Sequence, residues 1–311
     1  MAAGPYCGKL LADLGAEVIK VEPPEGDPAR RYGPFAGDEP GIERSGLFLY
    51  CNTNKLGITL NLRLPTGRQL FHDLLKQADV LIEDVPPQTE KALGLDYPTV
   101  SAVNPGLVVT SLTPFGKVGP HAAWKAYTLN VYQAGGEGYL LPGDLAYEMF
   151  RDREPVKAGG FAGAYDAGIY AGIATAAALY ERAASGQGQH LDTSEQEAQL
   201  QLNRATIVRW TGEQDLQSRA SRAYEFGGLF KGKDGYLLVR PNEDRHYEAL
   251  VEVIGDPALN DERFKARAGR LQHGKEINVI LARWMAEHGQ EEVYHKLSSR
   301  GGPAAFFATS E

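Results

Sequence analysis

The sequence predicts an α/β protein with a Rossmann-like parallel sheet domain, a long central helix and a second, smaller α/β domain. Three observations support this class. Strand-like and helix-like segments alternate through the first third of the chain, residues 164–184 form one long helical pattern, and a polar stretch at 212–223 precedes a hairpin signal. Regular alternation favours a parallel sheet with helices on both faces, whose ligands bind beyond the carboxyl ends of the strands.

The first domain is predicted to begin with a helix at 5–14, ended by Gly15, and a strand at 16–21. Residues 23–44 are rich in Gly, Pro and charge, which predicts a long functional loop. Further strands are predicted at 58–62, 79–83 and 107–112, and further helices at 65–76, 87–93 and 97–103.

Residues 155–197 are the centre of the first domain. The stretch 164–184 lacks proline and is rich in Ala and Leu, which predicts one long helix that is buried and central. Gly168 and Gly172 lie four residues apart on one face of it. Because a glycine costs a helix roughly 1 kcal/mol, the pair indicates that a backbone or a ligand approaches closely.

The end of the chain is predicted to form a smaller domain. After a short strand at 189–192, Ser194 and Glu197 form a capping box that begins a helix reaching Trp210. Residues 212–223 indicate a linker, and the turn signal Lys-Asp-Gly at 233–235 predicts a hairpin. Amphipathic helices are predicted at 245–254, 275–287 and 290–297. The predicted domains are therefore 1–211 and 224–311, joined by 212–223.

Composition and charge exclude several classes of partner. The chain has 311 residues, of which 43% are hydrophobic, and a formal net charge of −8 without a block of like charge, which argues against nucleic-acid binding. Its apolar runs are short and no charged-then-apolar leader begins it, so we expect no membrane span and a cytoplasmic protein. The partner is expected to be a small molecule or another subunit.

Motifs for metals and nucleotides are absent from the sequence. Cys7 and Cys51 are too few for a disulfide framework or a zinc site, and the histidines show no HExxH or Cys/His spacing, so we expect no metal. No GxGxxG follows a strand and no GxxxxGK[ST] occurs, so the usual glycine loops for dinucleotides and nucleoside triphosphates are missing. Any phosphate is therefore expected to be bound by side chains.

Two long runs resemble one protein family. GPYCGKLLADLGAEVIKVEPPEGDPARRYGPF, from Gly4, and ALYERAASGQGQHLDTSEQEA, from Ala178, are similar to the opening and the signature of the family III CoA-transferases. The resemblance spans nearly the whole chain. It implies an enzyme that moves CoA from an acyl-CoA donor to a small carboxylic acid acceptor, and an interlocked homodimer. The family also has a strand before the first helix and a last segment that returns to the first domain, and we expect both to be missing here.

The resemblance implies which side chains hold coenzyme A. Arg30 falls where the family has an arginine that contacts the nucleotide part of CoA, although composition alone favours a solvated arginine. Arg63 matches a family lysine on the CoA side of the cleft and keeps its charge. Guanidinium groups suit phosphate and adenine because they form bidentate hydrogen bonds and stack.

Three more positions are implied to lie beside CoA. Lys125 and Tyr127, in the run TPFGKVGPHAAWKAYTLNVYQAGGEG, fall on a Lys and a Tyr of the family, although Tyr127 is equally well explained as an aromatic packing residue. Ala92 stands where the family has Arg, and Lys91 beside it is a candidate substitute. Asp84 stands where the family has Asn.

The nucleophile is a departure from the family pattern. Family transferases use an aspartate near the start of the long helix, which gives a mixed anhydride and then an aspartyl-CoA thioester. The ungapped match places Ala164 there and Asp166 two residues later. A two-residue step rotates a side chain by about 200° on a helix. Asp166 is the candidate catalytic residue, and the alternative is a carboxylate that only stabilises the first helical turn.

Four functions are therefore considered. A CoA-transferase comes first, and a CoA-binding homologue or subunit that has lost its nucleophile comes second, because of Ala164. An acyl-CoA racemase is third, since the racemase branch has His where Tyr127 stands and tyrosine, with a pKa of about 10, is a poor base. A nicotinamide enzyme is last, because its glycine motif is missing. The donor and acceptor acids stay open.

Overall fold

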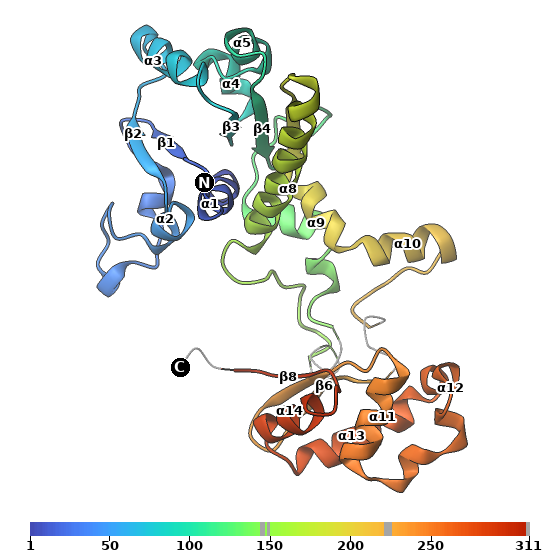
Figure 1. Ribbon diagram of the computed structural model, residues 1–311. Helices are drawn as coiled ribbons and strands as arrows, with labels where there is room; N and C mark the ends of the chain where they lie inside the picture. Colours follow the sequence, from blue (N-terminus) through green and yellow to red (C-terminus); the bar gives the residue numbers. More distant parts are fainter. Residues whose placement is uncertain (144–146, 148–149, 221–225, 309–311) are drawn as a thin grey trace. The chain divides into compact units, whose positions relative to one another are not determined.

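The computed structural model describes residues 1–143, 147, 150–220 and 226–308, and the chain forms two compact units (Figure 1). The first comprises Met1–Gly138 and Lys157–Thr211, and the second comprises Tyr139–Val156 and Gly212–Glu311. Strands and many helices occur together, so the predicted α/β class is confirmed. The predicted domain bounds stay a prediction. In the compact units, 139–156 is grouped with the second, where the Arg219 guanidinium donates to the carbonyl oxygen of Arg153.

The first unit contains two parallel sheets, β1–β2 and β3–β4–β5, with helices around them. Its strands are β1 (Ile19–Glu22), β2 (Leu56–Thr59), β3 (Val80–Glu83), β4 (Val108–Thr113) and β5 (His190–Ser194). Its helices are α1 (Ala3–Asp13), α2 (Gly46–Cys51), α3 (Pro65–Leu75), α4 (Pro87–Leu93), α5 (Tyr97–Val103), α6 (Thr128–Ala134), α8 (Ala162–Ser185), α9 (Glu195–Leu202) and α10 (Arg204–Glu213). The predicted alternation of strands and helices is therefore confirmed, with shifts of a few residues at element ends.

The sheet β3–β4–β5 has one face against α8. Thr110 and Leu112 of β4 lie on this face because side chains two apart share a side of a strand. The hydroxyl oxygens of Thr110 and Thr175, in the middle of α8, are 2.7 Å apart, and both side chains are fully buried. Leu112 belongs to an alanine-rich core cluster that also includes Ala164 and Ala167. These contacts fix the position of the long helix on the sheet.

Helix α1 crosses α8 at Gly168. A Cβ atom at Gly168 would lie 2.9 Å from the carbonyl oxygen of Ala3, whereas one at Gly172 would meet its nearest neighbour, a methyl group of Leu10, at 3.8 Å. The predicted close approach is therefore confirmed for Gly168, and the partner is the backbone of α1. The helix is buried on one side only, since Ile173 is 66% exposed.

Two stretches of the first unit differ from the sequence expectation. The single helix expected to reach residue 210 is divided into α9 and α10 at Asn203, whose amide donates to the carbonyl oxygen of Gly135 at 2.9 Å. Directly after the predicted loop at 23–44, Ser45 caps the short helix α2 by accepting a hydrogen bond from the backbone N–H of Phe48. Helical periodicity detects neither feature. The break depends on a contact with a residue distant in sequence, and α2 is too short to show a periodic pattern.

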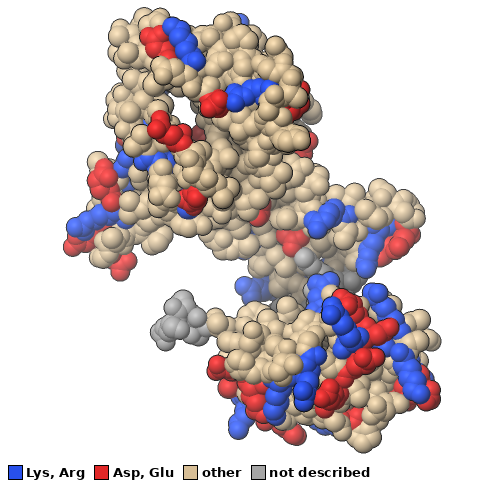
Figure 2. All heavy atoms as spheres, in the orientation of Figure 1, with Lys and Arg blue, Asp and Glu red and all other residues tan. Residues whose placement is uncertain are grey.

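The second unit is built on an antiparallel sheet. Strands β6 (Gly228–Lys231) and β7 (Tyr236–Val239) form the predicted hairpin, and β8 (Ala304–Phe306) pairs with β7. Helices α11 (Asp244–Ile254), α12 (Arg267–Gln272), α13 (Gly274–Ala286) and α14 (Gln290–Ser298) complete it. Basic and acidic side chains are interspersed on the face of this unit that Figure 2 shows. Its apolar core includes Leu237, Leu250 and Leu281, all at most 1% exposed.

No helix in the described ranges combines the length and the apolar character needed to cross a lipid bilayer.

Candidate functional site

The carboxyl edge of the β3–β4–β5 sheet carries polar side chains from three elements. Asp84 follows β3, Glu195 follows β5, and the start of α1 lies against Asp84, since the amine of Met1 is 2.6 Å from its Oδ2. A Cβ at Gly4 would lie 3.3 Å from the Cβ of Asp84. Parallel sheets of this kind bind ligands at the carboxyl ends of their strands. This edge, together with the start of α8, is the candidate site.

The start of α8 presents an alanine to the interior and an aspartate to α9. Ala164 is 4% exposed and packs in the core cluster that includes Ala198 of α9. Asp166 is half-buried, and its Oδ2 accepts a hydrogen bond of 3.0 Å from Nε2 of Gln199. The side chain at 164 therefore brings no functional group to the site, and the carboxylate of Asp166 is held from α9.

Asp84 and Glu195 are neighbouring carboxyl groups whose pKa values move in opposite directions. Burial raises the pKa of Glu195 and the charge of Asp84 adds to this, against the attraction of the Met1 amine. Burial also acts to raise the pKa of Asp84, but its ion pair with the amine outweighs this and leaves that pKa lowered.

A buried ion triad holds the loop after β4. The ammonium group of Lys117 lies 2.6 Å from a carboxylate oxygen of Glu83 and 2.6 Å from one of Glu90. All three side chains are at most 11% exposed. The backbone N–H of Lys117 also donates to Asp192 of β5 at 2.8 Å. These contacts hold the loop in position where it leaves the carboxyl edge of the sheet.

The predicted residues Lys125 and Tyr127 lie farther along this loop and are exposed. Tyr127 is 79% exposed and precedes α6, where its backbone N–H donates to the side chain of Asn130 at 2.9 Å. Lys91 is exposed on α4. Within the described residues, no hydrogen bond or ion pair joins any of the three to Asp166. The structure thus leaves their ammonium and hydroxyl groups accessible to a ligand.

Arg30 is engaged with the protein itself. Its Nε and Nη2 donate to the two carboxylate oxygens of Glu22, each at 2.8 Å, and its Nη1 lies 3.1 Å from Glu43. The guanidinium carbon is 3.7 Å from the centre of the Phe48 ring. The hydrogen bonds to Glu22 raise the pKa of Arg30. A ligand would therefore meet a guanidinium group that is already oriented by a bidentate ion pair.

Arg63 lies near the same loop as Arg30. Its side chain is 79% exposed and lies 3.7 Å from a carboxylate oxygen of Glu25. The backbone carbonyl oxygen of Glu25 accepts a hydrogen bond from the Arg31 guanidinium at 3.0 Å. Arg63 therefore contacts the loop that also carries Arg30.

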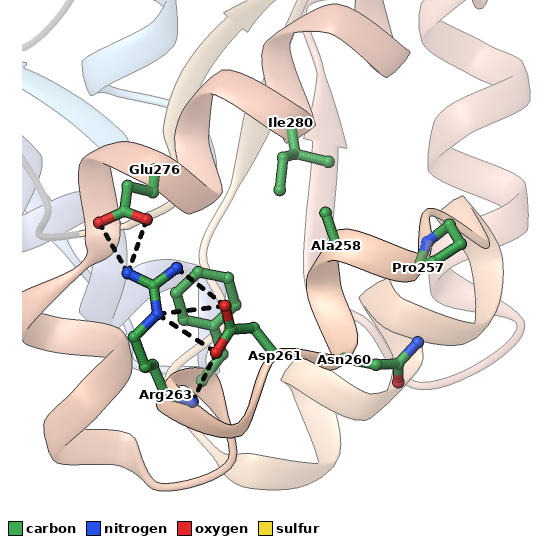
Figure 3. A pocket seen from close by; sticks show the side chains of 8 residues that line it. Pro257, Ala258, Asn260, Asp261, Arg263, Glu276 and Ile280 are labelled. Carbon is green, nitrogen blue, oxygen red and sulfur yellow. Dashed lines mark hydrogen bonds and ion pairs between the residues drawn. The ribbon is translucent and has the colours of Figure 1, made fainter.

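A separate cavity of about 330 Å³ lies in the second unit (Figure 3). Its lining includes Arg263, which points between Asp261 and Glu276 and contacts them at 2.8 and 3.0 Å. Because two carboxylates surround the one guanidinium group, this cavity does not suit the phosphates of CoA. We therefore place the candidate site in the first unit.

Sequence reasoning missed Gln199 and Glu195. Ser194 and Glu197 were recognised as a capping box, and Ser194 does accept from the N–H of Glu197 at 3.2 Å. The two residues that face the site from the same helix carry no local signal, because their role depends on the packing of α9 against α8. In the part of the chain that the structure describes, no group of three His, Cys, Asp or Glu side chains is placed to hold a metal ion.

The comparisons with known proteins agree on one family. The sequence model described as CoA-transferase family III matches residues 1–311. Succinyl-CoA–D-citramalate CoA-transferase of Chloroflexus aurantiacus is 31% identical, over 99% of this chain and 76% of the relative. Acetyl-CoA:oxalate CoA-transferase of Acetobacter aceti is 30% identical, over 96% of this chain and 76% of the relative.

Solved structures show the same fold. A CAIB/BAIF family protein from Brucella suis superposes with a TM-score of 0.79 at 30% identity, covering 99% of this chain and 81% of that one. Rv3272 from Mycobacterium tuberculosis superposes with a TM-score of 0.82 at 26% identity and the same coverage. The family resemblance of the two sequence runs is thereby confirmed, and the chain belongs to the family III CoA-transferases.

Proposed function

We propose that this CoA-transferase uses the carboxylate of Asp166 to carry CoA from an acyl-CoA donor to a carboxylic acid acceptor. The observation that carries the proposal is the 3.0 Å hydrogen bond from Gln199, which holds this half-buried carboxylate beside the start of α8. Ala164 occupies the position that matches the family nucleophile, and Asp166, two residues later, is the carboxylate that we propose in its place. Among the described residues, the other oxygen of this carboxylate has no hydrogen bond, and a carboxylate held by one oxygen suits nucleophilic attack on a thioester.

The proposed reaction balances without an added proton or redox partner. The carboxylate of Asp166 attacks the thioester carbonyl, the C–S bond breaks, and CoA leaves as a thiolate. The thiolate then attacks the aspartyl carbonyl of the mixed anhydride and releases the donor acid, which leaves an aspartyl-CoA thioester. The acceptor carboxylate and the thiolate repeat these two steps in reverse, and Asp166 is restored.

The relatives support small acids as substrates. One is named for succinyl-CoA and D-citramalate, another for acetyl-CoA and oxalate, and a third, from Agrobacterium fabrum, for succinate and glutarate. For this chain we propose a short acyl-CoA donor and a small carboxylic acid acceptor. The chain would act in the cytoplasm, where acyl-CoA is available.

We assign CoA binding to the five side chains implied by the sequence. The exposed Arg63, Lys91 and Lys125 would pair with phosphate groups, because each presents a charge to solvent. Arg30, held rigid by Glu22, would offer a guanidinium face to the adenine ring. Tyr127 would contact the pantetheine arm with its exposed ring.

A homodimer is part of the proposal. Apolar side chains remain exposed along α8 and α10: Ile173 at 66%, Tyr180 at 85% and Trp210 at 48%. Large apolar side chains that remain exposed on helices are typical of surfaces covered by another subunit. The second copy of the chain is the partner that we propose for them.

A CoA-binding homologue without catalysis is the second candidate. The observation that favours it is Ala164, whose methyl group is buried in the core and supplies no nucleophile. Such a chain would bind CoA and acyl-CoA and transfer nothing. It would differ from the first candidate only in the chemistry at Asp166.

Steady-state transfer by Asp166→Asn tests the proposal. With succinyl-CoA and a small dicarboxylic acid, we expect kcat to fall by at least about 1,000-fold, because an amide cannot form the anhydride. Glu197→Gln, an exposed carboxylate of α9, is the matched control and should keep full activity. Full activity of the Asp166 variant would show that Asp166 is not the nucleophile. A wild type that binds CoA but transfers none would support the CoA-binding homologue without catalysis.

A further inference from the structure

Gln199 is a fully buried polar side chain with an unusual division of partners. Its exposed fraction is 0%, and its Nε2 donates to the carbonyl oxygen of Gly163 at 3.2 Å and to Oδ2 of Asp166 at 3.0 Å. An amide nitrogen has two hydrogens, so both donors are used. Within the described residues, its Oε1 has no hydrogen-bond partner.

The orientation of this amide is determined by its two partners. Both the carbonyl oxygen of Gly163 and the carboxylate of Asp166 are acceptors, so the atom between them must be the NH₂ group. A flipped amide would place an oxygen against two oxygens. Gln199 therefore acts on Asp166 as a donor.

The stem of Gln199 is also fixed. A Cβ atom at Gly135, after α6, would lie 2.2 Å from the Cβ of Gln199, so only a glycine fits there. A Cβ at Gly163 would lie 3.5 Å from the Gln199 side-chain amide carbon. The amide thus reaches α8 from a stem packed between two glycines. A polar group that is buried so tightly and only partly satisfied needs an explanation beyond packing.

We propose that Gln199 is the positioning residue of the nucleophile. By holding Oδ2 of Asp166 it fixes the carboxylate plane, which leaves Oδ1 as the oxygen that attacks the acyl carbonyl. This inference rests on the proposed function, and it explains how an aspartate two residues past Ala164 is turned to a defined direction: its partner lies on α9.

Two variants of nearly equal size test this role. Gln199→Met keeps the stem and removes the donor, and Gln199→Glu replaces the donor with a second carboxylate. We expect kcat for CoA transfer to fall by about 10- to 100-fold in the first and more in the second, with KM for acyl-CoA within about twofold, because the lost contact orients the nucleophile and does not bind CoA.

The matched control is Gln196→Met on the same helix. Its Nε2 donates to the carbonyl oxygen of Ala134 at 3.2 Å, away from Asp166, so kcat should stay within about twofold of the wild type. Thermal unfolding of all variants, followed in parallel, identifies any loss of folded protein.

The possible outcomes separate the two proposals. If the wild type is active and folded Gln199→Met keeps its kcat, or its apparent kcat falls only in proportion to the folded protein that is lost, the positioning role is wrong and the proposed function stands. If the wild type itself transfers no CoA, the proposed function fails and the role of Gln199 fails with it. A loss of kcat per folded enzyme, with KM unchanged, supports the inference.

Discussion

Buried charges position the loop that follows β4. Lys117 is 8% exposed between the carboxylates of Glu83 and Glu90, which come from the end of β3 and from α4. Removing one partner of a buried ion pair is costly because the remaining charge stays in a poorly solvated place. Here the ammonium group is shared by two carboxylates, so its removal would leave both uncompensated.

Lys117→Met is therefore expected to lower the free energy of unfolding by about 3–5 kcal/mol. Lys76→Met is the control, since Lys76 is 58% exposed and pairs with Asp73 at 2.7 Å, and we expect less than about 1 kcal/mol there. Urea unfolding of both variants measures the difference. Equal losses would show that the triad adds nothing to an ordinary surface pair.

The buried thiol of Cys7 is expected to make the free energy of unfolding depend on pH in the alkaline range. Cys7 is fully buried between α1 and α8, and burial raises the pKa of its thiol from 9.0 to about 12. A raised folded-state pKa gives stability that is fully present below the unfolded value and is lost as pH rises through the folded one. The contribution of Cys7 is therefore complete below pH 9 and declines towards about pH 12.

Cys7→Ala removes this contribution. Between pH 9 and about pH 12, the free energy of unfolding should fall more steeply in the wild type than in the variant. Lys55, whose pKa burial lowers to about 8, acts in the opposite direction and is present in both proteins. Chemical unfolding across this range is the measurement, and parallel curves would contradict the account.

At the scale of elements, the crossing of α1 and α8 places the start of both helices beside the sheet edge. The crossing depends on Gly168, because only a hydrogen there leaves room for the carbonyl oxygen of Ala3. The sequence already indicated this contact through two glycines on one helix face. It did not distinguish them, since helical spacing is the same for Gly172.

Gly168→Ala and Gly172→Ala are expected to change stability in opposite directions. The first forces a Cβ to 2.9 Å from a backbone oxygen and should cost about 1–3 kcal/mol. The second finds ordinary contact at 3.8 Å and should gain up to about 1 kcal/mol from helix propensity. Thermal or urea unfolding of the two variants measures these changes. A similar loss of stability in both would contradict the expected difference and would indicate a close contact at Gly172 as well.

The remaining element-scale differences have a common cause. Periodicity predicted β3, α4, α5 and β4 within a residue because each pattern lies within its own segment. It did not predict the break at Asn203, which bonds to Gly135 in another part of the chain. Gln199 was missed for the same reason, because Asp166 and Gly163 are more than 30 residues away in sequence.

At the scale of the whole molecule, the sequence predicted family and fold class better than the state of individual site residues. Two long runs were enough for the family, and the family model covers the whole chain. Arg30 was expected to be available for CoA. In the fold, two of its N–H groups donate hydrogen bonds to Glu22, which lies eight residues earlier in the sequence. Such competition between a ligand and a protein partner is invisible in a sequence.

The account as a whole requires that this chain itself carry the transferred group. Hydroxylamine added during incubation with succinyl-CoA converts an aspartyl thioester or anhydride into a stable hydroxamate, and mass spectrometry of the peptides locates it. We predict a hydroxamate at Asp166 in the wild type and a greatly reduced yield in Gln199→Met. A hydroxamate at another carboxylate, or CoA binding with no hydroxamate anywhere, would contradict the central claim.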